Sequence, residues 1–167
     1  AQIKLRLREL VGKARLFAAG SEVEVNGEEP RGRVLRGFSE LIVRTYPNLP
    51  MLNGITFSEN EIARYMQLAQ NTPLGTLEFT EAEQEMMGFI QADNRNGIRT
   101  TLKSLEDKFT RKPYGWDLAA IQCLLAKLCG RGKVEARSGG NLLEDDNLER
   151  ALKNTHGFPN VILEPQI

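Results

Sequence analysis

The chain has 167 residues, of which 41% are hydrophobic and 26% are charged, and its 22 basic and 22 acidic residues leave no net charge. This length suits one ordinary domain or two small ones, and the composition excludes a disordered protein. No apolar run approaches the roughly 18 residues of a membrane span, so we expect a cytoplasmic protein with no membrane partner. The first residues have no initiator methionine and read as the middle of a helix, so we expect a piece of a longer chain.

Helices are predicted to dominate the N-terminal part. Apolar residues recur at helical spacing over residues 7–17 and predict an amphipathic helix. The alternating sequence SEVEV at residues 21–25, followed by Asn26-Gly27, predicts a short strand and a turn. Helical spacing returns over residues 33–46 and stops at Pro47, because the residue before a proline disfavours the α conformation.

Two capping signals and a chain break divide the sequence. Ser58 and Thr80 are each followed three residues later by a glutamate, the spacing of a helix capping box, and each predicts a helix. Between these helices, the sequence NTPLG at residues 71–75 interrupts the helical pattern and predicts a loop. We therefore expect a helical subdomain with a short strand over residues 1–75 and a second domain over residues 76–167.

The second domain has the element order of a winged helix. Residues 98–109 and 117–129 predict two helices joined by a Pro-Gly turn, and residues 134–137 and 158–163 predict two strands that pair as a wing. A short helix predicted at residues 146–154 would be inserted within the wing. The expected fold class is mainly α with short β-strands (α+β), a winged-helix-like unit preceded by a helical subdomain.

Basic residues gather in this winged-helix unit, although the whole chain is neutral. Residues 97–137 hold nine basic and four acidic side chains, and lysine and arginine at such positions can contact phosphates. The candidate nucleic-acid-binding residues are Arg95, Arg99, Lys103, Lys108, Arg111, Lys112, Arg131, Lys133 and Arg137. The alternative is that they form solvated faces or ion pairs with the acidic segments 51–97 and 138–167.

The helix that would read bases has an unsuitable surface. Ten of its thirteen residues from 117 to 129 are apolar, leaving only Asp117, Gln122 and Lys127 as polar residues. A helix that is apolar on every face is buried, so we expect the rest of the chain or a partner to cover it. Tyr114 and Trp116, at its entrance, are expected to anchor the turn and not to stack on bases.

The sequence predicts no catalytic, cofactor or metal site. The GK pairs of residues 130–133 and 11–13 lack the earlier glycine and the following Ser or Thr of a phosphate loop. Cys123 and Cys129 point in different directions on one helix and are interpreted as small buried residues. With His156 as the single histidine, zinc ligands are too few. We therefore expect that this region is not an enzyme by itself.

The segment KFTRKPYGWDLAAIQCLLAKLCGRGKVEA, residues 108–136, resembles a motif of the large P-loop ATPases of bacterial phage-defence BREX systems, of the BrxC and PglY type. The strand before Asn26-Gly27 and the sequence LIVRTYPNL look similar as well. The resemblance implies an internal, non-catalytic region of such an ATPase. The parent's ATP and magnesium would be bound elsewhere, since no Walker motif is present here.

Two functions are compatible with this resemblance. The first is assembly with other BREX proteins or with other regions of the parent chain, sequence-independent contact with duplex DNA, or both. The alternative is a purely structural or protein-docking module that binds no nucleic acid.

Overall fold

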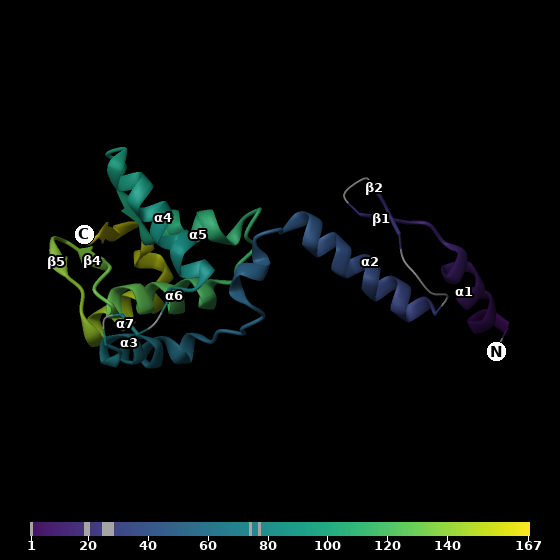
Figure 1. Cartoon of the computed structure of the whole chain (residues 1–167), viewed down its shortest axis with the longest axis horizontal. Helices are drawn as coiled ribbons and strands as arrows, with labels where there is room; N and C mark the ends of the chain where they lie inside the picture. Colours follow the sequence, from purple (N-terminus) through teal and green to yellow (C-terminus); the bar gives the residue numbers. More distant parts are fainter. Residues whose placement is uncertain (1, 19–20, 25–28, 74, 77) are drawn as a thin grey trace. The chain divides into compact units, whose positions relative to one another are not determined.

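The computed structural model describes residues 2–18, 21–24, 29–73, 75–76 and 78–167, and the chain forms two compact units, residues 1–49 and 50–167 (Figure 1). These bounds differ from the predicted division near residue 75. The physical reason is that α3 (Ile62–Asn71), expected in the N-terminal subdomain, packs along α6 (Leu118–Gly130) in the second unit.

The first unit contains two helices and a short hairpin. Its elements are α1 (Gln2–Lys13), β1 (Leu16–Ala18), β2 (Ser21–Val23) and α2 (Pro30–Thr45). The expectation of a helix through Phe17 was wrong, because Arg15 forms an ion pair with Glu22 and residues 16–18 pair with β2 as an antiparallel strand. The predicted strand after residue 20 is confirmed, whereas the predicted Asn26-Gly27 turn lies outside the described residues.

α2 confirms the predicted second helix, and local chemistry explains both of its ends. Pro30 occupies its first turn, where a missing N–H has no cost. The Glu29 carboxylate accepts a hydrogen bond from the Gly32 amide at 2.6 Å and caps the helix. The helix stops at Thr45, two residues before Pro47.

The second unit begins with two 3-10 turns, η1 (Leu49–Leu52) and η2 (Glu59–Glu61). Ser58 Oγ accepts from the Asn60 amide at 3.4 Å, so its helical segment starts as a 3-10 turn in place of the expected capping box. The predicted capping box of α4 (Glu81–Arg95) is confirmed: Thr80 Oγ1 accepts from the Glu83 amide at 3.3 Å, and Glu83 Oε2 accepts from the Thr80 amide at 2.8 Å.

The rest of the second unit is the expected winged helix. After α4 its elements are β3 (Thr100–Thr101), α5 (Leu102–Thr110), α6, β4 (Val134–Ser138), β5 (Asn141–Leu142), α7 (Asp145–Lys153), η3 (Thr155–Asn160) and β6 (Val161–Pro165). The sheet order is β3-β6-β4-β5, with antiparallel neighbours. The predicted wing is confirmed, since β4 pairs with β6 from Val134↔Pro165 to Ser138↔Val161, with α7 inserted between them.

Two short strands were not predicted. The segment before Leu102 was expected to be helical, but Thr100 pairs with Leu163 of β6, and Thr101 caps α5 by accepting from the Ser104 amide at 3.1 Å. β5 pairs with β4 through Gly139 and Gly140, whose φ angles of 57° and 82° match a tight hairpin turn that glycine favours.

α6 lies at the centre of this unit and contacts α3, α4, α5 and α7. Its close approach to α3 depends on Gly130. A Cβ atom at this position would lie 2.6 Å from the Met66 carbonyl oxygen and 2.9 Å from Ala69 Cβ. Because the nearest atom belongs to the backbone, a side chain at residue 130 would force the two helices apart.

We therefore expect Gly130→Ala to destabilise the protein by about 1–3 kcal/mol, since overpacking a close helix contact strains the backbone. Gly88→Ala is the matched control, because a Cβ at this α4 position meets nothing within 4 Å, and it should be neutral or stabilising by up to about 1 kcal/mol. Urea denaturation followed by circular dichroism measures both changes. Equal free energies of unfolding for the two variants would contradict the close packing.

Candidate functional site

α6 is the second helix of the helix-turn-helix, the element that enters the DNA groove in DNA-binding members of this architecture. It is called the recognition helix below. Asp117 starts it, because its Oδ1 accepts from the Ala120 amide at 3.0 Å. The apolar residues that follow make most of the helix buried, so its ability to read bases depends on its few polar side chains.

The two polar side chains within the recognition helix are engaged inside the protein. Gln122 Nε2 donates to the Leu152 carbonyl at 2.6 Å, and Lys127 Nζ lies 3.0 Å from Glu83 Oε1. Asp117, which precedes the helix, is exposed and caps it through Oδ1. Direct readout needs exposed donors and acceptors that reach base edges, and neither Gln122 nor Lys127 is available for this purpose.

The rest of the chain covers the recognition helix, as the sequence predicted. α3 runs along it and contributes the buried residues Ile62, Met66 and Ala69. The close contact at Gly130 leaves no space between the two helices at that point. α3 therefore covers one side of the recognition helix.

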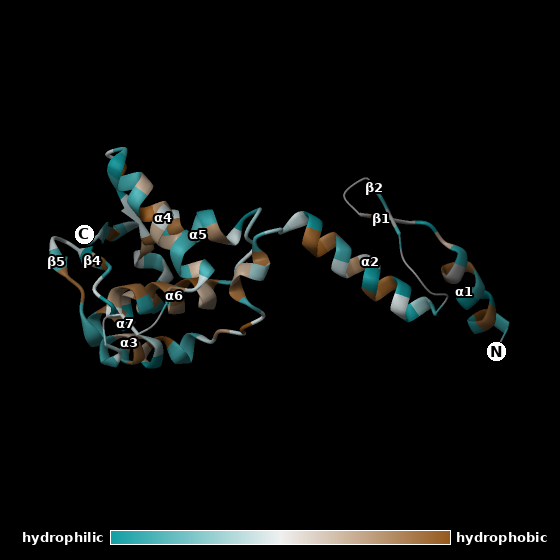
Figure 2. Ribbon diagram, in the orientation of Figure 1, coloured by the Kyte–Doolittle hydropathy of each residue, from teal (hydrophilic) through white to brown (hydrophobic). Residues whose placement is uncertain are grey.

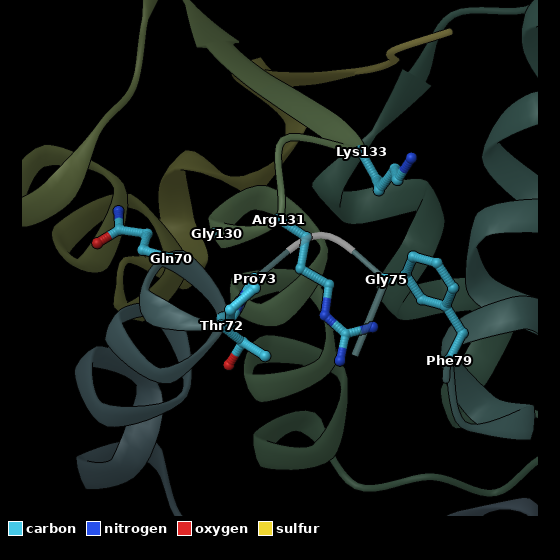
Figure 3. Close-up of a pocket in the computed structure, with 9 residues that line it drawn as sticks. Gln70, Thr72, Pro73, Gly75, Phe79, Gly130, Arg131 and Lys133 are labelled. Atoms are coloured by element: carbon cyan, nitrogen blue, oxygen red, sulfur yellow. The ribbon is translucent and has the colours of Figure 1, made fainter. Parts of the chain in front are cut away.

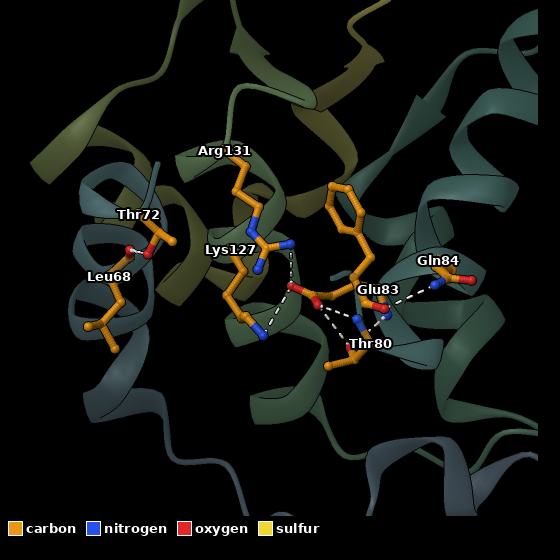
Figure 4. Close-up of polar contacts among 8 residues, drawn as sticks. Leu68, Thr72, Thr80, Glu83, Gln84, Lys127 and Arg131 are labelled. Atoms are coloured by element: carbon orange, nitrogen blue, oxygen red, sulfur yellow. Dashed lines mark hydrogen bonds and ion pairs between the residues drawn. The ribbon is translucent and has the colours of Figure 1, made fainter. Parts of the chain in front are cut away.

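A buried ion cluster fastens α4 to the recognition helix (Figure 4). The Glu83 side chain is fully buried, with Oε2 in the capping box and Oε1 facing Lys127 Nζ at 3.0 Å and Arg131 Nη1 at 3.8 Å. The Arg131 guanidinium also lies 4.6 Å from the centre of the Phe79 ring. Arg131, a predicted phosphate contact, is therefore a packing and charge partner with 11% of its side chain exposed.

A pocket of about 240 Å³ lies beside this cluster, where the C-terminal ends of α3 and α6 meet (Figure 3). Gln70, Thr72, Phe79, Arg131 and Lys133 contribute to its lining. Helix C-termini carry partial negative charge. The two cations, Arg131 and Lys133, complement these helix ends.

Three other candidate nucleic-acid-binding residues also have partners within the protein. Lys103 Nζ lies 3.2 Å from both Glu106 and Asp107 on α5, and these carboxylates raise its pKa. Arg137 pairs across 2.7 Å with Glu135 and 3.2 Å with Glu164, and hydrogen bonding to Glu135 raises its pKa. Lys108 Nζ lies over the Phe89 and Tyr114 rings, 5.6 and 5.8 Å from their centres.

The remaining candidate nucleic-acid-binding residues do not form one cluster along the sequence. Arg95 and Arg99 precede α5, while Arg111 and Lys112 follow it, and a nine-residue helix is roughly 13 Å long. Lys133 precedes the wing strand β4. Within the described part of the chain, Arg99, Arg111, Lys112 and Lys133 have no ion-pair partner. Phosphate contact by these residues stays a prediction.

The aromatic residues of the PYGW sequence anchor the turn, as expected. Trp116 stacks on Phe109 with ring centres 4.6 Å apart and planes 8° from parallel, and Tyr114 meets Phe109 edge-on at 4.7 Å. Both are buried, so neither is available to stack on bases. Gly115, between them, has φ 64°, which explains a glycine at this position.

Sequence reasoning missed the second role of Glu83, which it interpreted only as a helix cap. Its neighbours Ala82 and Met86 are apolar and buried, and a glutamate within such a sequence is a signal that a buried cation accompanies it. That the cations are Lys127 and Arg131, more than forty positions later in the sequence, depends on the tertiary fold.

The described residues contain neither a candidate metal site nor a membrane-spanning helix. No group of three or more His, Cys, Asp or Glu residues there could hold a metal ion, and no helix there is long and apolar enough to cross a membrane. Burial raises the pKa of the Cys123 thiol to about 12. This thiol donates to the Ser58 carbonyl at 3.4 Å and has a packing role.

We expect Glu83→Ala to destabilise the protein by about 3–5 kcal/mol, because it leaves Lys127 and Arg131 without their buried counter-charge. Glu81→Ala is the control, since this glutamate lies exposed in the same first helical turn. Thermal and urea unfolding would measure both variants. A Glu83 variant as stable as the Glu81 variant would show that the cluster does not hold α4 to the recognition helix.

Comparison with known proteins agrees with this geometry. No solved structure matches the chain. A family model described as the winged helix-turn-helix domain of the BREX ATP-binding protein BrxC matches residues 53–166, which are about two thirds of the sequence. The match includes α3 together with the winged helix, and it does not include the first unit. The chain therefore belongs to the family of the BREX BrxC winged helix-turn-helix domain.

Proposed function

We propose that this chain is a protein-assembly region of a large BREX phage-defence ATPase, in which the winged helix is a docking scaffold and not a reader of DNA bases. The observation that carries the proposal is the engagement of Gln122 and Lys127, the two polar side chains within α6, inside the protein. A recognition helix without free polar side chains cannot distinguish base pairs, but a rigid, fully packed unit suits protein docking.

The partners in this proposal are other BREX proteins or other regions of the parent chain. ATP and magnesium would be bound by a separate part of the parent, as the family resemblance implies. Arg131 and Arg137 form ion pairs with glutamates of the acidic segments 51–97 and 138–167. Because these two cations are neutralised within the chain, they favour a docking role over DNA contact.

Sequence-independent contact with duplex DNA is the second candidate. It is favoured by Arg99, Arg111 and Lys112, which are exposed and have no ion-pair partner among the described residues. Such cations contribute affinity through phosphates, and this affinity falls steeply with salt. Three such cations neutralise few phosphates, so this contribution is small.

Assembly is tested in the full-length parent protein. We expect deletion of residues 1–167 to abolish co-purification with the other proteins of the BREX system, because the docking scaffold is removed. The rate of ATP hydrolysis should stay within about twofold of the intact protein, since the proposed nucleotide site lies elsewhere. Loss of ATP hydrolysis with assembly intact would contradict the proposal.

DNA contact is tested by filter binding of the chain to two unrelated duplexes across a salt series. At about 0.15 M salt, where exposed charges are screened beyond ~8 Å, we expect no saturable binding. At about 0.05 M salt any binding should be weak, equal for both duplexes, and lost when Arg99, Lys103, Arg111 and Lys112 are changed to Glu. Tight binding to one duplex at the higher salt would refute the docking scaffold.

A further inference from the structure

α2 presents an apolar stripe to solvent. Val34, Leu35, Phe38, Leu41 and Ile42 recur at helical spacing and lie on one face of the helix; this set is called the α2 stripe. Figure 2 shows hydrophobic residues recurring along α2. Phe38 is 61% exposed, and no residue of the helix is buried. An exposed row of large apolar side chains on one helix face marks an interaction surface.

The described residues of the first unit leave this stripe exposed. α2 contacts the α1–β1 segment through its other side, where Arg33 donates to the Ala14 carbonyl. Arg33 lies roughly 140° around the helix from Phe38, at about 100° per residue. None of the residues in 2–49 whose burial is described is buried. A unit of this size with so much exposed apolar surface needs a covering partner to be stable.

The charges of the first unit indicate the chemistry of that partner. Of the five carboxylates in its described part, those of Glu22 and Glu40 are paired with arginines, that of Glu29 caps α2, and those of Glu9 and Glu24 have no ion-pair partner there. Six exposed cations there also have no ion-pair partner: Lys4, Arg6, Arg8, Lys13, Arg31 and Arg36. Unpaired basic side chains therefore outnumber unpaired acidic ones in the described part of the unit, which complements an acidic partner.

Arg31 restricts the partner further. It lies three residues before Val34 and seven before Phe38, and this spacing continues the line of the stripe. A partner that covers the stripe therefore reaches the Arg31 guanidinium. A cation covered in this way needs a carboxylate against it, because desolvating an unpaired charge is costly.

We propose that the α2 stripe docks an acidic amphipathic helix of a partner protein. The partner's apolar face meets Val34, Phe38 and Leu41, and its carboxylates meet Arg31. This inference rests on the proposed assembly function and assigns that function to a surface outside the winged helix. A second copy of the chain fits less well because it brings the same unpaired cations.

The test uses the whole chain and a labelled synthetic probe peptide, a helix with glutamates on one face and leucines on the other, followed by fluorescence anisotropy. A peptide of the same composition in scrambled order is the probe control. We expect the amphipathic probe to bind and the scrambled probe not to bind. Equal binding of the two peptides, or no binding of the amphipathic probe at low salt, would overturn the inference.

Two valines of α2 provide a matched pair of variants. Val34 in the stripe is 56% exposed, and Val43, roughly 180° away around the helix, is 54% exposed. We expect Val34→Asp to weaken probe binding about tenfold or more, because a carboxylate replaces a buried apolar contact, and Val43→Asp to leave it unchanged. Arg31→Glu should weaken binding more than Arg36→Glu, which lies on the opposite side. Equal effects of the two valine variants, or of the two arginine variants, on probe binding would refute docking at the α2 stripe.

Two further measurements test whether a membrane or a second copy of the chain occupies the α2 stripe. Flotation with vesicles containing anionic phosphatidylserine, and sedimentation velocity of the chain alone, should show no dependence on Val34. Vesicle binding or dimerisation that Val34→Asp abolishes would assign the stripe to a membrane or to a second copy and overturn the proposal. If Val34→Asp in the full-length parent leaves BREX assembly intact, the stripe proposal fails while the assembly function stands.

Discussion

The packing of α3 against α6 is the contact on which the second unit depends. α6 is apolar on nearly every face, so it must be surrounded, and α3 approaches closely enough that Gly130 cannot carry a side chain without moving the helices. The buried carboxylate of Glu83, facing Lys127 and Arg131, holds α4 to the same helix. Together these contacts make the recognition helix the core of the unit.

This arrangement has a direct functional consequence. A helix-turn-helix reads DNA when its second helix is exposed and polar. Here the chain retains the order of helices and wing, but the two polar side chains within α6, Gln122 and Lys127, turn inward toward a carbonyl and a carboxylate. What remains is a rigid scaffold with a few separated cations on its surface, which supports protein docking in the BREX system more than recognition of a sequence.

The first unit has the opposite character. Its helices α1 and α2 carry apolar faces, yet none of its residues whose burial is described is buried. Hydrophobic surface that the described residues of the unit leave exposed is available for binding a partner, and the excess of arginines and lysines in the described part of the unit selects the charge of what binds. The chain thus combines a packed family domain with an apolar, basic surface.

Most elements could be predicted from the sequence, because local signals set them: the Thr80–Glu83 capping box, Asp117 before α6, and the glycines of the wing. The apolar composition of residues 117–129 also predicted that α6 is buried. Only the tertiary structure decided what buries it. The partners of Glu83, Arg131 and Arg137, the two-residue strands β3 and β5, and the division near residue 49 depend on segments far apart in the sequence. Local spacing holds no information about such contacts, because they form only when the helices pack.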